Sequence, residues 1–183
     1  MKLEDLAEIS IGILVKRERK ETGENRYKLF SLKNYEEKLE FEEIRTEKKL
    51  DNSISKEGDL LFRLVYPNKI ILVDRTIQGL LIPSQFCIIR TKKIRPIVLK
   101  WYLESQKVRE ELEIKASNSI IKNTKVSSIR KLEIPEIEEE KQKDMEKLIK
   151  LWEKEKEIHK KILNDKEKLY NFYLEKMIQK DIW

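Results

Sequence analysis

The stretch DLLFRLVYPNKIILVDRTIQGLLIPSQFCIIR, residues 59–90, decides the fold of this chain. Branched and aromatic residues gather there in short runs, and Gly, Pro, Asn and Asp separate the runs. This pattern is typical of β-strands joined by turns. We predict turns over 56–59 and 66–69, strands over 59–66, 69–74 and 86–91, and a further strand over 26–32.

The tripeptide Pro-Ser-Gln at 83–85 interrupts two apolar runs of the same stretch. Proline removes a backbone donor and ends an extended segment, so we expect the chain to bend there. Beyond the bend, Phe86, Ile88 and Arg90 can alternate along a new strand. We therefore interpret this point as a corner of the scaffold.

A helix is predicted over 95–114, because Pro96 fits the first turn of a helix and apolar residues recur after it. A polar stretch at 115–128 follows it. We expect the aromatic pair of this helix to lie in the core, and the alternative is that it stacks on bases. The residues available for its buried face are Val98, Trp101, Tyr102, Val108 and Leu112.

A long amphipathic helix is predicted from Glu138 to Gln179. The segment contains no Gly or Pro, and apolar residues recur at helical spacing. At 1.5 Å per residue it would span about 60 Å, more than the width of so small a domain. We expect its apolar stripe to form a coiled coil with another helix; folding onto its own domain is the alternative. The predicted dimer interface comprises Met145, Leu148, Trp152, His159, Ile162, Leu169, Tyr173 and Met177.

These elements indicate an α+β (mixed α/β) fold. We expect residues 1–135 to form a globular domain with a twisted mixed sheet, and residues 136–183 to form a helical spacer and dimerisation segment. The chain has 183 residues, which is too short for two full domains and a linker. Hydrophobic residues make up 39% of it, enough to bury a core although 40% of the residues are charged.

The sequence offers little support for catalysis. Cys87 is the only cysteine and His159 the only histidine, so an internal disulfide, a Cys/His zinc site and a Ser-His-Asp triad are not expected. The four glycines form no phosphate-binding loop. We expect the acidic run at 138–140 to begin a helix rather than to hold a nuclease metal. His159 is expected to set the register of the coiled coil.

No membrane segment is predicted. The longest aliphatic runs, such as Ile70–Val73, fall far short of the roughly 20 residues that span a bilayer. The N-terminal MKLEDLAEIS carries acids where a signal peptide needs an apolar stretch. We therefore expect a cytoplasmic protein.

Positive charge is concentrated in the first part of the chain. The net charge is +6, and residues 1–135 carry 28 Lys and Arg against 21 Asp and Glu, whereas residues 136–183 carry 12 against 13. All ten arginines precede residue 131. Arginine offers a planar fork for guanine edges and phosphates, so a polyanion is the expected partner.

The residues expected to contact DNA lie in polar stretches outside the predicted core. Arginine suits guanine, Asn and Gln suit adenine, and Lys and Ser suit phosphates. A plain solvated surface is the alternative for each stretch. The predicted DNA-binding residues are Arg17, Arg19, Arg26, Arg63, Tyr66, Asn68, Lys69, Arg75, Gln78, Lys115, Asn118, Ser119, Lys122, Asn123 and Lys125.

Three segments, in order, resemble the specificity (S) subunits of type I restriction-modification systems. LEDLAEISIGI, residues 3–13, resembles the opening segment of that family. Residues 57–90 resemble the middle of its target recognition domain, with a Gly-Asp turn, a proline-containing loop and a closing strand. Residues 94–149 resemble the last helix, polar loop, short strand and helical spacer. Two features depart from the family pattern: residues 116–119 lack the usual loop glycine, and the start of the spacer is reduced to Pro135 and Gln142.

The resemblance implies a function. A full S subunit has two target recognition domains and two antiparallel spacers, and this chain resembles half of one. The family relationship implies a non-catalytic, sequence-specific DNA recognition subunit of a phage-defence system. It would direct a partner adenine-N6 methyltransferase, and a restriction subunit where one is present, to one half of a bipartite site, as a dimer or with another half-subunit. S-adenosylmethionine would bind the methyltransferase, and this chain would need no cofactor.

Two other functions remain open at this point. A coiled-coil adaptor would bind a protein through its long helix, and its basic surplus would be incidental. A small nuclease would cleave DNA with a metal ion held by carboxylates. Binding to defined duplexes across a salt series separates DNA recognition from the adaptor, and metal-dependent cleavage would identify a nuclease.

Overall fold

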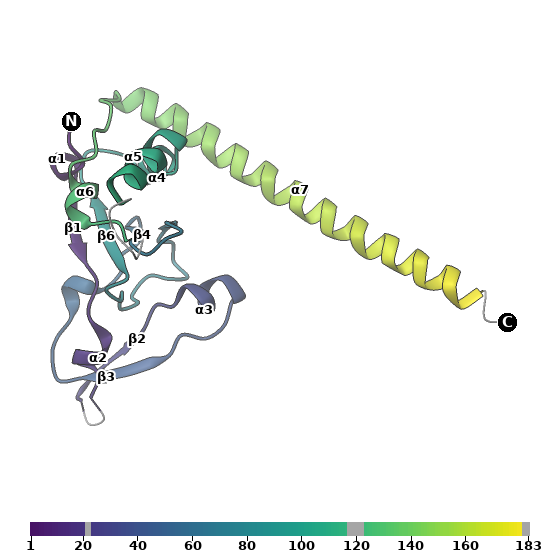
Figure 1. The fold of residues 1–183 in the computed structure, drawn as a ribbon, viewed down its shortest axis with the longest axis horizontal. Helices are drawn as coiled ribbons and strands as arrows, with labels where there is room; N and C mark the ends of the chain where they lie inside the picture. Colours follow the sequence, from purple (N-terminus) through teal and green to yellow (C-terminus); the bar gives the residue numbers. More distant parts are fainter. Residues whose placement is uncertain (21–22, 117–122, 181–183) are drawn as a thin grey trace. The chain divides into compact units, whose positions relative to one another are not determined.

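The computed structural model describes residues 1–20, 23–116 and 123–180. The chain divides into two compact units, Met1–Gln142 and Lys143–Trp183. Unit 1 holds the sheets and the shorter helices, and unit 2 is formed by most of the long helix α7 (Figure 1). The boundary predicted between residues 135 and 136 stays a prediction.

A four-stranded sheet forms the centre of unit 1, in the order β1-β6-β4-β5. The three strands predicted between residues 59 and 91 are present, and β1 is an additional edge strand that the sequence did not reveal. The strand pairings of this sheet, β1 with β6, β6 with β4 and β4 with β5, are antiparallel. The strands are β1 (Ala7–Ile11), β4 (Leu60–Arg63), β5 (Ile70–Leu72) and β6 (Phe86–Thr91).

The α+β class is confirmed, with one change of detail in the sheet. We expected a mixed sheet, whereas parallel pairing in the described residues is limited to the isolated bridges Ile13–Pro83 and Leu29–Leu81. Each bridge involves a residue of the segment that precedes β6, Leu81 or Pro83. These bridges lie outside the strands, so the four-stranded sheet is antiparallel and the expectation of a mixed sheet is wrong.

The interruption at 83–85 is a bend, as predicted. The amide of Phe86 donates to the carbonyl of Pro83 at 3.0 Å, which closes a tight turn before β6. Upstream of it, Leu81 bridges both Leu29 and Ile54. Gly12 is packed so closely here that an added Cβ would lie 2.3 Å from the Pro83 carbonyl oxygen. The corner therefore joins three distant segments of the chain.

The main core cluster lies on one face of this sheet. Phe30 and Phe86 meet edge to face with ring centroids 5.2 Å apart, and Leu61 and Ile88 are buried beside them. Alternation along β4 and β6 accounts for this arrangement, because residues two apart share a face. Ile77, Leu80 and Ile82 add to the cluster from outside the strands.

A separate two-stranded ribbon is formed by β2 (Asn25–Lys28) and β3 (Glu43–Thr46). Only β2 was predicted, as part of a longer strand. Ile44 and Thr46 are buried on the inner face of the ribbon. In Figure 1 the ribbon and helix α2 (Val15–Glu18) lie at the end of unit 1 opposite the helices α4 and α5.

The helix predicted over 95–114 consists of two helices, α4 (Pro96–Leu103) and α5 (Gln106–Ala116). The break falls at Glu104 and Ser105, and the amide of Arg109 donates to the carbonyl of Ser105. Serine is a favoured residue at a helix start, so the sequence carried a signal for a second helix there. The remaining short helices are α1 (Leu3–Leu6), α3 (Leu32–Glu37), η1 (Asp51–Ser53) and α6 (Val126–Arg130).

The prediction that Trp101 lies in the core is wrong. Its side chain is 44% exposed, whereas Leu99 and Leu103, two positions away on either side, are buried. Two residues turn an α-helix by about 200°, so Trp101 lies on the opposite face. Tyr102 is partly buried, and its hydroxyl donates to the carbonyl of Glu133 at 3.0 Å.

The long helix is confirmed as α7 (Glu139–Lys180). The apolar residues that we assigned to a dimer interface are exposed, apart from the partly exposed Met145, and His159 is exposed among them. None of the described helices, α7 included, is long and apolar enough to cross a membrane.

Candidate nucleic-acid interface

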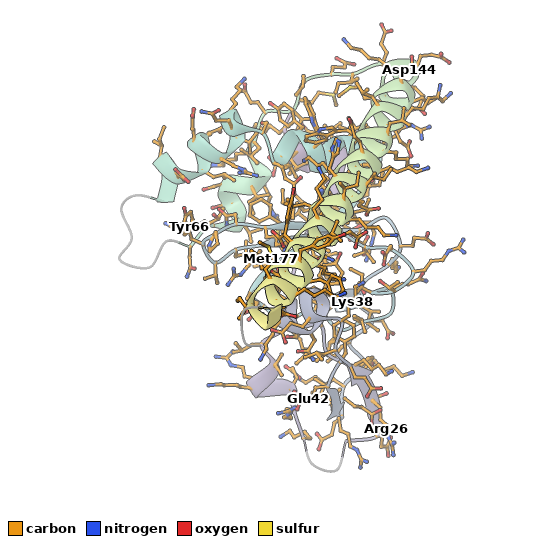
Figure 2. The ribbon with its side chains drawn as sticks, turned by 90° about the vertical axis from the view of Figure 1, so that its right-hand side faces the viewer. Arg26, Lys38, Glu42, Tyr66, Asp144 and Met177 are labelled. Atoms are coloured by element: carbon orange, nitrogen blue, oxygen red, sulfur yellow. The ribbon has the colours of Figure 1, made fainter. Side chains whose placement is uncertain are left out.

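The predicted DNA-binding residues fall into three groups in unit 1. The first group lies on the loop 63–69 and at 123–125, the second on the loop 74–79, and the third on α2 and the ribbon. Figure 2 shows Tyr66 of the first group and Arg26 of the third at separate edges of the unit. Asn118, Ser119 and Lys122 lie outside the described residues, as does the side chain of Lys115.

The first group joins two polar stretches that are far apart in the sequence. Val65 and Asn123 form an antiparallel bridge, and the amide of Thr124 donates to the carbonyl of Leu64 at 2.8 Å. The amide of Asn68 is used on both sides: its nitrogen donates to the carbonyl of Arg63 at 2.8 Å, and its oxygen accepts from Thr124 at 3.1 Å. Asn68 therefore holds the two stretches together.

Exposed polar groups surround this junction. Tyr66 is half exposed beside a shallow pocket of about 200 Å³, which Lys69 and Glu113 also line. Lys69 forms an ion pair with Glu36, and Asn123 and Lys125 are exposed at the start of α6. The junction thus offers a phenol, an amide and two ammonium groups to a ligand.

The second group lies on the turn between β5 and the corner. Arg75 is almost fully exposed, with its guanidinium 3.7 Å from the carboxylate of Glu57, and Gln78 is exposed. Asp74 organises the turn, because its carboxylate accepts from the hydroxyl of Thr76 at 2.6 Å and from the amide of Thr76 at 2.8 Å. The hydroxyl bond lowers the pKa of Asp74, which keeps that carboxylate charged.

The third group lies around the ribbon. Arg19 forms an ion pair with Glu42, and Arg26 lies 3.7 Å from Glu43. Arg17 is exposed on α2, and the described chain holds no side-chain partner for it. We expected DNA contacts to come from loops, whereas Arg26 lies within strand β2 and Arg63 ends β4.

One arginine of this surface was missed by the sequence reasoning. Arg45 stands on β3 directly opposite Arg26, and it is exposed. The alternation of Glu43-Ile44-Arg45-Thr46 was the available signal, since it matches a half-buried strand. The flanking acids at 42, 43 and 47 masked it.

Another arginine belongs to the scaffold. Arg90 of β6 makes a two-pronged ion pair with Asp59 at 2.9 and 2.8 Å, and the Asp59 side chain is only 2% exposed. The hydrogen bonds that Arg90 donates to the Asp59 carboxylate raise the pKa of Arg90. Asp59 also accepts from the amide of Lys56 at 2.8 Å, so the pair fixes the predicted turn at 56–59, where Gly58 has a positive φ of 88°.

Groups that would serve other chemistry have structural roles. Cys87 is buried in β6, and burial raises its pKa to about 12. In the acidic run at 138–140, Glu139 forms an ion pair with Arg95 at 2.6 Å. Among the residues that the structure describes, no three His, Cys, Asp or Glu side chains are grouped as a metal site would need.

These features define an α+β domain with basic surfaces, followed by a long helix with an exposed apolar stripe. No protein-family model matches the chain, and no curated protein matches it. Solved structures do match its fold. A chain from a structure on complex assembly and conformational transition of the type I R-M system gives a TM-score of 0.62 at 17% identity. The HsdS subunit from Thermoanaerobacter tengcongensis gives 0.60 at 18% identity.

The particular fold is therefore that of type I S-subunit structures, as the sequence resemblance implied. Each of these two matches covers 87% of this chain and 43% of the solved chain, so this chain spans about two fifths of their length. The S subunit from M. genitalium also matches, with a TM-score of 0.45 at 17% identity, over 74% of this chain and 33% of that one.

Proposed function

We propose that this chain recognises a DNA sequence as a specificity component of a type I restriction-modification system. The observation that carries the proposal is the fold match, which extends over 87% of the chain and includes HsdS at a TM-score of 0.60. Fold alone does not define function, so the proposal also depends on the basic surfaces of unit 1. They supply the cations that a polyanion requires.

In this proposal, some exposed groups of unit 1 contact phosphates and others contact base edges. Phosphates are contacted by exposed ammonium groups such as Lys125 and Lys20, which fix the position of the protein on the duplex. Base edges are contacted by arginine and amide groups, for which Arg75 and Gln78 are suited by their exposure. The residues predicted from the sequence remain the candidates for these contacts.

Helix α7 provides the second half of the proposal. Its exposed stripe follows a 3.5-residue repeat, which favours pairing with a second helix over a solvated single helix. Two paired spacers hold two recognition domains at a fixed distance, which suits a bipartite site. The second helix belongs to another copy of this chain or to a different half-subunit.

The chain itself is proposed to be non-catalytic. The chemistry would belong to a partner adenine-N6 methyltransferase, which binds S-adenosylmethionine, and to a restriction subunit where one is present. This chain would determine the DNA sequence at which the methyltransferase acts. A cytoplasmic location follows from such a role.

The test combines methylation mapping with direct binding. The gene is expressed with the neighbouring methyltransferase gene in a methylation-free host, and methylated adenines are mapped across the genome. We expect one bipartite motif, which disappears when this gene is deleted. Purified chain should then bind duplexes carrying that motif, with an affinity that falls steeply as salt rises.

Two outcomes would contradict the proposal. An unchanged methylation pattern after deletion of this gene would show that the chain does not direct the methyltransferase. No binding to the duplex at low salt, with helix pairing intact, would favour the coiled-coil adaptor, for which the exposed stripe of α7 is the supporting observation.

A further inference from the structure

The outer face of the β2–β3 ribbon carries an arrangement of charge that stability does not explain. Side chains alternate across a strand, so Arg26 and Lys28 of β2 share a face with Glu43 and Arg45 of β3. In the observed register Lys28 stands opposite Glu43, and Arg26 stands opposite Arg45. Like charges directly opposite each other destabilise a ladder. The arginine pair therefore points to a purpose other than folding.

Acidic neighbours do not fully compensate this pair. Glu43 reaches Arg26 diagonally at 3.7 Å, and it is also the direct neighbour of Lys28. In residues 1–20, 23–116 and 123–180, no acidic side chain pairs with Arg45. An open hollow beside β3 adds Lys16, Arg19 and Lys20 to Arg45; Glu43 also lines it, and Glu42 pairs with Arg19. This edge of the ribbon is thus a local concentration of cations.

The ribbon is also held in place from its inner side. Ile44 and Thr46 are buried, and the hydroxyl of Tyr27 accepts from the amide of Leu50 at 3.1 Å. The amide of Lys20 donates to the carbonyl of Arg45 at 2.9 Å, which ties the end of α2 to β3. An added Cβ on Gly23 would lie 2.4 Å from the nitrogen of Thr46, so the backbone at Gly23 packs directly against β3. A supported ribbon presents its outer side chains in a fixed geometry.

We propose that this ribbon enters the major groove of DNA and that Arg26 and Arg45 read guanines there; this inference rests on the proposed function. The major groove, about 12 Å wide, admits a two-stranded ribbon, and strands lie about 4.8 Å apart. Arginine binds the O6 and N7 atoms of guanine with both prongs of its guanidinium. Cβ atoms of opposite residues lie about 5 Å apart, and the long, flexible arginine side chains can converge from there on bases spaced about 3.4 Å along one strand. The pair is thus suited to adjacent G·C base pairs.

The choice of arginine makes the proposal testable by a substitution that keeps charge. Lysine retains the positive charge and phosphate affinity but lacks the planar fork. The variants Arg26→Lys and Arg45→Lys therefore separate base reading from simple attraction. Arg45→Ala removes both properties. As a control outside the candidate interface, Arg95→Lys makes the arginine-to-lysine change at the start of α4, a helix at the other end of unit 1 from the ribbon (Figure 1).

The experiment selects bound duplexes from a pool of randomised 30-base-pair DNA, using the full chain with and without the methyltransferase. We expect the wild-type chain to enrich a motif containing G·C pairs. Arg45→Lys and Arg26→Lys should each reduce the preference for G at one position about tenfold, with an unchanged salt slope. Arg95→Lys should leave the preference at those positions intact. Melting temperatures within a few degrees of wild type would show that the variants fold.

Each other outcome is decisive. If the lysine variants select the wild-type motif, the ribbon does not read bases and the inference fails, while the proposed function stands. If only Arg45→Ala weakens binding and lowers the salt slope, Arg45 contacts a phosphate, which also overturns base reading. If the wild-type chain enriches no motif even with the methyltransferase, the proposed function itself fails.

Discussion

Charged substitutions in the stripe of α7 provide the most quantitative test of helix pairing. Leu148, Ile162 and Leu169 are 69%, 45% and 51% exposed, so about half of each side chain remains to be buried by a partner helix. Full burial of a Leu or Ile side chain contributes roughly 1.5–3 kcal/mol, so each would contribute about 1 kcal/mol on pairing. Six such side chains in a symmetric pair amount to about 6 kcal/mol. Replacing all three by Glu should raise the dimer dissociation constant by about 10⁴-fold.

The measurement is analytical ultracentrifugation of the full chain over a range of concentrations. A matched control replaces Lys154, Lys161 and Lys168 by Gln, which changes the net charge by the same amount at positions of the same helix outside the stripe. The control should remain dimeric. A triple Glu variant with an unchanged dimer mass would refute the coiled coil, and a monomeric wild-type chain would refute pairing between identical copies.

Three further predictions concern unit 1. Asp59→Asn should lower the free energy of unfolding by about 2–3 kcal/mol in urea denaturation, because Arg90 loses a buried partner; a loss below about 0.5 kcal/mol would show that the pair is not structural. Gly12→Ala should destabilise the corner by more than a substitution of an exposed residue such as Ser127→Ala, measured as a fall in melting temperature, because the new Cβ at position 12 would lie 2.3 Å from the Pro83 carbonyl oxygen. Cys87 should react with iodoacetamide at pH 8 only as fast as the domain unfolds, because burial raises its pKa to about 12; prompt labelling of the native protein would contradict this.

The pH dependence of stability follows from the same cysteine. Its folded pKa of about 12 lies above the ordinary value of 9.0, so the unfolded chain releases the thiol proton first as pH rises. The contribution of Cys87 is therefore complete below about pH 9 and decreases between pH 9 and 12. Cys87→Ala should remove that part of the alkaline decrease, which urea titrations at pH 8 and pH 10.5 would measure.

The elements predicted from the sequence are those with a strong local pattern. β4, β5 and β6 are apolar runs with clear turns between them, and α7 has a long uninterrupted helical repeat, so each was visible without tertiary information. β1 and β3 were not visible, because AEISI and EIRT alternate apolar residues with charged or polar ones over only a few positions. Their pairing comes from contacts with distant strands, which a short segment does not record.

For the candidate site too, the sequence could not predict what depends on contacts between distant segments. The sequence could indicate that Arg63–Lys69 and 115–128 are polar and basic, but their meeting at Val65 and Asn123 depends on the fold. Asn68 was expected to contact adenine, and its amide closes the loop instead of being freely available. A residue type suited to a ligand is equally suited to the turn that carries it.

Arg45 illustrates why the surface must be derived from register rather than from composition. The segment 42–48 holds three acids, and charge counting assigns it no basic character. Strand alternation separates Arg45 from Ile44 and Thr46, and pairing with β2 brings it opposite Arg26. The corner at 83–85 has the complementary role: it places β6 against β1 and β4 and anchors the segments that lead to the ribbon. In the proposed function, the scaffold and the recognition surface are therefore separate parts of one unit, so changes to the ribbon should alter the DNA sequence that is bound while leaving the fold intact.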